Sequence, residues 1–216
     1  MTKEQWIKFC KALQPGDVLF VESKDITGFA ITLGTGNRDD IETAHSFQYV
    51  GNGQGVTIEA DPKGTNWHHI DEYMDRTIAG KTRLIVCRPK DITVEELEQM
   101  KIEWKNLVGR PYGWGAIVGY GIYWFIKNTP IGALISAFKL ANPLANPKTP
   151  VCSQAVYLAL KAHDLSARTI HKKLKFGDCT PEALLNHIYL SCIFLYDTQR
   201  IDRYDRWDFP GRKKKK

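Results

Sequence analysis

The chain has 216 residues, which is long enough for one domain with a substantial hydrophobic core. Hydrophobic residues make up 43% of it and charged residues 25%, the usage of a globular protein rather than a disordered one. Of the formal net charge of +6, residues 212–216 supply five charges, which leaves +1 for the rest of the chain. A nucleic-acid-binding surface is therefore not indicated, and nucleic acid is not expected as a partner.

The five cysteines are scattered, and no two have the C-x-x-C spacing of a zinc site. We expect no metal, no organic cofactor and no dense disulfide framework. Residues 1–13 alternate charged and apolar side chains and lack the apolar centre of a signal peptide. A cytoplasmic location is the default expectation, with export by a signal-independent route left open. The sequence leaves the oligomeric state open.

Apolar runs and turn residues divide the first part of the chain into short elements. Residues 5–13 have the spacing of an amphipathic helix, and residues 18–21 are typical of a buried strand. Two more strands are expected at residues 45–50 and 56–60. The glycine-rich segment between them is typical of the turn of a β-hairpin.

Further elements follow the hairpin. Residues 84–87 form an apolar run typical of a strand, and a late strand is expected at residues 190–196. Between them, Thr93 and Glu96 have the spacing of a capping box at the start of a helix over residues 93–107. This mixture of helices and strands predicts an α+β fold.

An aromatic, glycine-rich stretch of 16 uncharged residues lies between Arg110 and Lys127. It is shorter than the ~20 apolar residues that cross a membrane. We therefore expect residues 114–144 to form an apolar helical insertion in a single domain spanning residues 1–211. Residues 212–216 are expected to be a disordered basic tail, with peripheral contact to an anionic membrane surface as the alternative.

Cys152 is the candidate nucleophile. Thr149 resembles a helix N-cap and Pro150 a first helical residue, so a helix over residues 150–163 would carry Cys152 in its first turn. Free amides and the helix dipole there lower the pKa of a thiol, and the same amides can hold an oxyanion. A buried structural cysteine is the alternative. The other four cysteines lack this setting and are expected to be structural.

His45 and Glu59 stand on the two strands of the expected hairpin. Antiparallel pairing brings them near each other, with Cβ atoms ~5 Å apart if they lie directly opposite. A carboxylate that fixes the tautomer of a histidine base is the usual companion of a cysteine nucleophile. A solvated cross-strand ion pair is the alternative. Two later histidines, His171 and His187, adjoin no strand with a following acid and rank lower.

Five short motifs resemble those of NlpC-type cysteine hydrolases. Gly16-Asp17 with residues 18–20, residues 44–51 around His45 and residues 56–60 around Glu59 resemble their Gly-Asp, histidine and acid strands, and residues 109–115 and 151–154 resemble their tyrosine and cysteine motifs. The order is inverted relative to the unpermuted members. The sequence therefore resembles the circularly permuted branch, over roughly residues 14–190. That branch includes YiiX-like hydrolases and the lecithin–retinol acyltransferases.

The resemblance implies a permuted papain-like α+β fold, in which a small antiparallel sheet packs on a nucleophile-bearing helix. It implies Cys152 as nucleophile, His45 as base and Glu59 as the residue that orients the base. Tyr112 is implied as a positioning or oxyanion-stabilising residue, with packing beside Trp114 as the alternative. The implied activity is that of a cysteine hydrolase acting on amide or ester bonds through a thioester, with acyl transfer as a variant. The substrates would be N-acyl or lipid compounds or cell-wall peptides.

Two departures from the family pattern bear on these expectations. Phe47 stands where the family tends to have a small residue and is expected to narrow the site. The segment Val151-Cys152-Ser153 lacks the Asn-Cys-Glu of the acyltransferases, which favours the YiiX-like hydrolases. Two other classes of function stay open: a catalytically inactive ligand-binding domain of the same fold, and a membrane-associated interaction protein.

Overall fold

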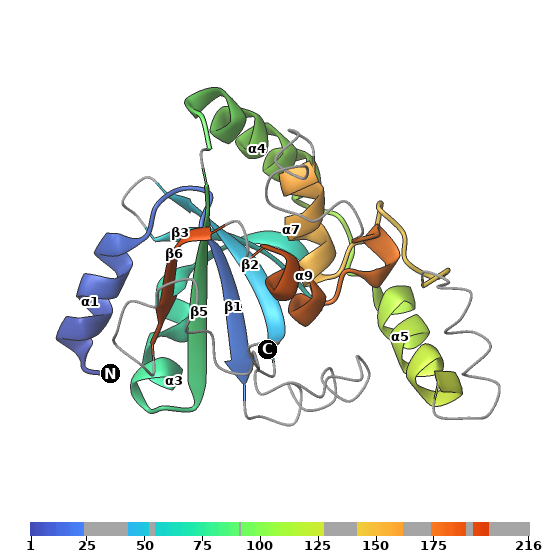
Figure 1. Cartoon of the computed structure of the whole chain (residues 1–216), viewed down its shortest axis with the longest axis horizontal. Coiled ribbons are helices and arrows are strands. Elements are labelled where there is room, and N and C mark those ends of the chain that lie inside the picture. Colours follow the sequence, from blue (N-terminus) through green and yellow to red (C-terminus); the bar gives the residue numbers. More distant parts are fainter. Residues whose placement is uncertain are drawn as a thin grey trace, which may run out of the picture.

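A six-stranded antiparallel sheet with helices on both faces makes up the part of the chain described by the computed structural model (Figure 1). The described residues are 1–23, 43–51, 55–90, 92–127, 142–161, 174–188 and 192–198. The strands are β1 (Val18–Ser23), β2 (Thr43–Gly51), β3 (Val56–Asp61), β4 (Gly64–His69), β5 (Thr82–Pro89) and β6 (Cys192–Asp197), in the spatial order β4-β3-β2-β1-β5-β6. The helices are α1 (Lys3–Ala12), α3 (Met74–Ile78), α4 (Val94–Leu107), α5 (Trp114–Lys127), α7 (Cys152–Lys161) and α9 (Pro181–Ile188), with short 3-10 helices η1 (Ile70–Tyr73) and η2 (Phe176–Asp178).

The central strand β1 is buried on both faces because successive side chains of a strand point to opposite sides. Val18 and Phe20 join the core under α4, α7 and α9. Leu19 and Val21 join a second core under α1 and η1. Figure 1 shows α1 on one side of the sheet and α7 with α9 on the other. The α+β class expected from the sequence is confirmed.

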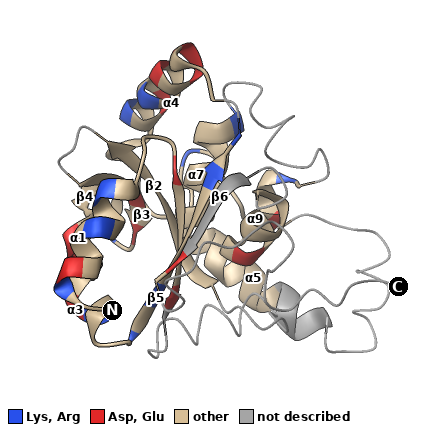
Figure 2. Cartoon of the chain, turned by 60° about the vertical axis from the view of Figure 1, so that its left-hand side comes forward, with Lys and Arg blue, Asp and Glu red and all other residues tan. Residues whose placement is uncertain are grey.

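Helix α4 begins where the sequence predicts a cap. Thr93 accepts a hydrogen bond from the Glu96 amide (3.1 Å), and the Glu96 carboxylate accepts one from the Thr93 amide (2.9 Å). This reciprocal pair satisfies two amides that have no partner within the helix. Acidic and basic residues both occur along α1 and α4 (Figure 2), which is typical of helices with one face in solvent.

The Gly-Asp motif has a structural role at the start of β1. Gly16 has a φ of +92°, a left-handed conformation that favours glycine. Asp17 is fully buried and accepts two hydrogen bonds from the Arg88 guanidinium, of 2.7 and 2.8 Å, and one from the Gln14 amide. A buried carboxylate needs such a partner, so this pair joins β1 to the end of β5.

The predicted apolar insertion is described only in part. Residues 114–127 form α5, on which Trp114, Val118 and Ile122 are each at least half exposed. Residues 128–141 and the basic tail, residues 212–216, lie outside the described residues. Within the described part, no helix has both the length and the apolar character needed to span a membrane.

Candidate active site

His45 and Glu59 are in direct contact, although not in the register expected from the hairpin. His45 Nε2 lies 3.0 Å from Glu59 Oε2. A bulge between Tyr49 and Gly51 sets the register by pairing Gln48 with Ile58. His45 therefore lies two residues beyond the position opposite Glu59. Because the offset is two residues, both side chains lie on the same face of the sheet. The two side chains bridge the longer diagonal distance between His45 and Glu59.

Glu59 is held by a buried network rather than by solvent. Its side chain is 4% exposed. Oε1 accepts a hydrogen bond from the Thr57 hydroxyl (2.9 Å), and Oε2 accepts one from the Tyr73 hydroxyl (2.6 Å). Burial raises the pKa of Glu59, but the hydrogen bond and charge of His45, with the two hydroxyl bonds, lower it below its ordinary value. This arrangement excludes the solvated ion pair that the sequence left open.

Tyr73 was not identified from the sequence. It lies in η1, beyond the hairpin and β4, and reaches back to Glu59. Tyr73 ends η1 and directly precedes α3, and nothing in the local sequence indicates this contact. Burial raises the pKa of Tyr73 well above its ordinary value, and Glu59 adds to the shift, so its hydroxyl stays a donor.

Phe47 packs beside the histidine instead of narrowing an opening, which corrects the expectation from the sequence. Its side chain is fully buried in the core beneath α1 and η1. The ring stacks on Tyr73 with centroids 5.0 Å apart, and its centroid lies 5.9 Å from that of His45. Because β2 alternates its side chains, Phe47 shares a face with His45 and fills the space next to it.

The nucleophile helix begins two residues later than the Thr149-Pro150 pattern predicts. Helix α7 starts at Cys152, so Val151 is its cap. The Gly113 amide donates a hydrogen bond to the Pro150 carbonyl (3.2 Å). Because this carbonyl is bonded to Gly113 and not to an amide of α7, Pro150 lies outside the helix. The Val151 amide is capped by Gln154 Oε1 at 3.2 Å. Cys152 thus occupies the first helical position, where the N-terminal end of the helix dipole favours an anion.

Cys152 and His45 interact, and each shifts the pKa of the other. Burial raises the pKa of Cys152, but the charge and hydrogen bond of His45, together with the Ser46 and Ser153 amides, hold it below the ordinary value of a thiol. Burial lowers the pKa of His45, but the Cys152 thiolate and then Glu59 raise it to about 10. Glu59 engages Nε2, which leaves Nδ1 for the thiol. The shifts favour a thiolate–imidazolium pair.

The surroundings of the other cysteines with described side chains do not stabilise a thiolate. Burial raises the pKa of Cys10 to about 12 and that of Cys179 well above its ordinary value. Cys87 is fully buried in the core. The Cys179 thiol donates to the Ser153 carbonyl at 3.4 Å. Within the described side chains, Cys152 is thus the cysteine whose surroundings stabilise a thiolate.

Tyr112 lies near the nucleophile and also packs on Trp114. Its ring meets that of Trp114 edge to face, with centroids 5.2 Å apart. Burial raises the pKa of Tyr112 above its ordinary value, and the charge on Cys152 adds to this shift. Its hydroxyl therefore remains protonated and can donate. Both roles that the sequence left open, packing and positioning, are compatible with this placement.

The first turn of α7 is anchored by Gln154, Ser153 and their partners. Gln154 Nε2 donates to the Tyr120 hydroxyl (3.1 Å) and to the Phe176 carbonyl (3.2 Å). The Ser153 hydroxyl donates to the Cys179 carbonyl. Ser153 and Gln154 are both fully buried. These bonds tie the helix start to α5 and to the η2 segment, and they fix the position of Cys152.

The remaining histidines lie in β4, in α9 or outside the described residues. His68 and His69 belong to β4, and they contact acidic residues of η1. His187 lies in α9, whereas His171 falls outside the described residues. Within the described part of the chain, no three His, Cys, Asp or Glu side chains are grouped so as to hold a metal ion.

Comparisons with known proteins give a weak structural similarity. No protein-family model and no curated protein matches the sequence. Among solved structures, the chain is similar to metalloprotein yiiX from Escherichia coli O157:H7, with 17% sequence identity and a TM-score of 0.47. The match covers 69% of this chain and 66% of that chain. The function proposed below therefore rests on the geometry of the site.

Proposed function

We propose that this protein is a cysteine hydrolase of the permuted papain-like type, cleaving amide or ester bonds through a thioester. The observation that carries the proposal is the arrangement of Cys152, His45 and Glu59: His45 lies 3.0 Å from Glu59, His45 and Cys152 shift each other's pKa, and Cys152 stands at a helix N-terminus. A nucleophile in contact with a base, and a base oriented by a carboxylate, is the arrangement that acyl transfer requires. The circularly permuted chain order noted in the sequence supports the same assignment.

The reaction follows from the charges of the resting pair. The Cys152 thiolate attacks the substrate carbonyl carbon, and a carbon–sulfur bond forms as the carbonyl oxygen becomes an oxyanion. The His45 imidazolium then gives its proton to the leaving nitrogen or oxygen as the scissile bond breaks. Water attacks the thioester, His45 takes its proton, and the thiolate leaves. The same intermediate gives acyl transfer when another nucleophile replaces water.

The oxyanion needs donors near Cys152, and two kinds are at hand. Amides at the start of α7 point toward an anion at that end of the helix, and the Ser46 amide already approaches the sulfur. The Tyr112 hydroxyl stays protonated beside Cys152. We assign Tyr112 to positioning of the substrate or stabilisation of the oxyanion.

For the substrate, we favour a compound with an acyl chain over a charged cell-wall peptide. Tyr112 joins the site to α5, where Trp114, Val118 and Ile122 recur every four residues and are 56%, 55% and 50% exposed. Side chains spaced in this way share one face of a helix. Such a face can hold an acyl chain or rest on a lipid surface.

Intact-mass spectrometry tests the proposed activity. The protein is incubated with a mixture of N-acyl amides and acyl esters, and with matched peptide amides, then quenched in acid. A mass increase equal to the acyl group, lost after hydroxylamine and absent in Cys152→Ala, is the expected result. A folded protein that reacts with iodoacetamide at Cys152 but forms no adduct and releases no product would support the inactive ligand-binding domain instead.

A further inference from the structure

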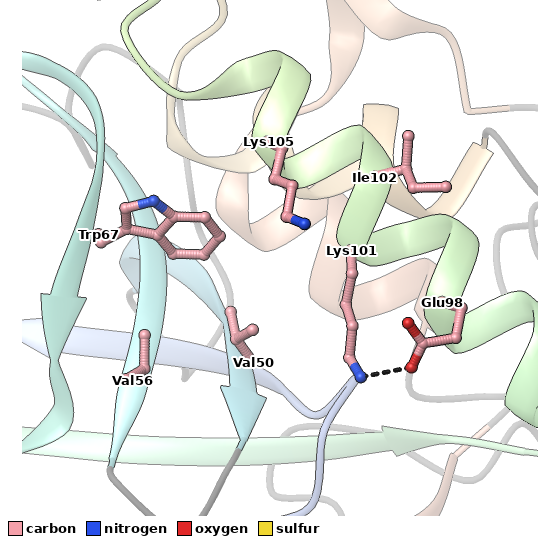
Figure 3. A pocket seen from close by; sticks show the side chains of 7 residues that line it. All are labelled: Val50, Val56, Trp67, Glu98, Lys101, Ile102 and Lys105. Atoms are coloured by element: carbon pink, nitrogen blue, oxygen red, sulfur yellow. Dashed lines mark hydrogen bonds and ion pairs between the residues drawn. The ribbon is translucent and has the colours of Figure 1, made fainter.

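A groove of about 370 Å3 lies between α4 and the end of the sheet formed by β2, β3 and β4 (Figure 3). Its lining comes from three strands and one helix: Val50, Val56, Trp67, Glu98, Lys101, Ile102 and Lys105. None of these residues belongs to the candidate active site. Pockets that hold small molecules usually measure ~300–1,000 Å3 and are mostly apolar with a few polar groups.

The walls of the groove expose large apolar side chains that come from different elements. Trp67 on β4 is 43% exposed, and Ile102 on α4 is 52% exposed. Figure 3 shows the Trp67 indole turned toward the space between β4 and α4, with Val50 and Val56 on the strand side. Covering such surface is favourable by roughly 25 cal/mol per Å2. The groove thus offers a flat aromatic surface and an aliphatic floor.

The charges of the groove do not balance. Lys101 Nζ pairs with Glu98 Oε1 at 2.6 Å, so these two largely neutralise each other. Lys105 lies one helical turn further along α4 and extends toward the Trp67 ring (Figure 3). Lys105 has no ion-pair partner among the residues that the structure describes. One ammonium group therefore remains available beside an apolar surface.

The groove is preformed, because α4 is fixed on the sheet independently of any ligand. The Trp104 indole donates to Gln48 Oε1 on β2 at 2.7 Å, and both side chains are buried. Thr93 and Glu96 cap the start of the helix. A binding site that does not have to be ordered avoids part of the entropic cost of association.

We propose that this groove binds a small amphipathic carboxylate. Its ring or short chain lies against Trp67 and the two valines, and its carboxylate lies at Lys105. A cation would meet the Lys105 ammonium, and a neutral apolar compound would lack the ionic contact. A polyphosphate would find one unpaired lysine and an apolar floor. The proposal does not depend on the function assigned to Cys152, since the groove shares no residue with that site.

The proposal is tested by titrating 15N-labelled protein with 2-naphthoate while NMR monitors the indole N–H signals of the tryptophans. The Trp67 signal is assigned from its absence in Trp67→Phe. We expect saturable one-to-one binding that shifts the Trp67 signal. Binding of the neutral 2-naphthamide should be at least several-fold weaker. Raising the salt concentration should weaken the binding of 2-naphthoate but not that of 2-naphthamide, because salt screens the attraction between the exposed Lys105 and the carboxylate.

Two matched pairs of variants locate the site. Ile102→Glu places a carboxylate in the groove and should weaken 2-naphthoate at least tenfold, whereas Val94→Glu, on an exposed position of the same helix, should not. Lys105→Gln should remove the preference for 2-naphthoate over 2-naphthamide, whereas Lys81→Gln should keep it. Ile102, Val94 and Lys105 on α4 and Lys81 before β5 are all exposed, so folding is expected to be unaffected, and circular dichroism checks this.

The proposal is overturned if 2-naphthoate does not bind at millimolar concentration, or if Ile102→Glu leaves its affinity unchanged. It is also overturned if Ile102→Glu changes the sedimentation coefficient of the ligand-free protein, because the groove would then be a contact between copies of the chain. Loss of 2-naphthoate binding in Cys152→Ala would place the ligand in the other site. None of these results bears on hydrolysis, which is measured separately.

Discussion

Tyr73 donates a hydrogen bond of 2.6 Å to Oε2 of Glu59, the same oxygen that lies 3.0 Å from His45. One carboxylate oxygen therefore holds both the base and a tyrosine that belongs to a different element. Phe47 stacks on the Tyr73 ring and adjoins His45, so the three side chains form one packed unit. The orientation of His45 depends on this unit and not on the hairpin alone.

Tyr73→Phe should weaken the hold on Glu59 while it keeps the stack on Phe47. A net hydrogen bond contributes about 1 kcal/mol, so we expect kcat to fall roughly five-fold with little change in KM. Tyr157→Phe is the matched control, because it removes a buried tyrosine hydroxyl that donates to the Leu174 carbonyl away from Glu59. Equal effects of the two substitutions on kcat would assign Tyr73 to stability only.

The pH dependence of the reaction should report the thiolate–imidazolium pair. The Cys152 pKa is lowered, so alkylation should be fast at neutral pH and slow only as acid protonates the sulfur. The His45 pKa is raised to about 10, so turnover should fall as the pH rises through that value and the proton donor is lost. Glu59→Gln removes a charge that raises the His45 pKa, and should move the alkaline limb to lower pH. Stopped-flow alkylation and pH–rate profiles measure both limbs, and an unmoved alkaline limb would contradict the role of Glu59.

Cys152 should be the most reactive of the five cysteines. Its surroundings lower the thiol pKa, whereas burial raises that of Cys10 and Cys179. Brief labelling with iodoacetamide at pH 6.5, followed by peptide mapping, should place most of the label on Cys152. Cys152→Ser should lose that label without gaining it elsewhere. Preferential labelling of Cys10 or Cys179 in the folded protein would argue against the assignment.

His45→Ala should abolish turnover and leave the protein folded, because His45 is 21% exposed and adds little to the core. General acid–base catalysis typically contributes 10²–10⁴-fold, about 3–5 kcal/mol of the barrier. Steady-state rates on the substrate found by mass spectrometry measure this loss. His171→Ala and His187→Ala serve as controls and should stay within a few-fold of the unaltered protein. If His171→Ala or His187→Ala abolished turnover and His45→Ala did not, the base would lie downstream of the nucleophile and the permuted assignment would be wrong.

The sequence by itself indicated several of the elements and three residues of the candidate site, Cys152, His45 and Glu59. The apolar run of residues 18–21, the glycine-rich segment before Val56 and the capping box of Thr93 and Glu96 are local patterns, and the structure contains the strands and the helix that they predict. Cys152 also stands at a helix start, as expected. These features depend on neighbours within a few residues, which is why the sequence shows them directly.

Only the tertiary structure decided how these residues meet. The bulge between Tyr49 and Gly51 places His45 diagonal to Glu59. The hydrogen bond between Gly113 and Pro150 makes α7 begin at Cys152 and not at Pro150. Tyr73 reaches Glu59 only because η1 packs under β2. Such contacts join segments far apart in the chain, and their geometry follows from the packing of whole elements. No local pattern of residue types encodes it.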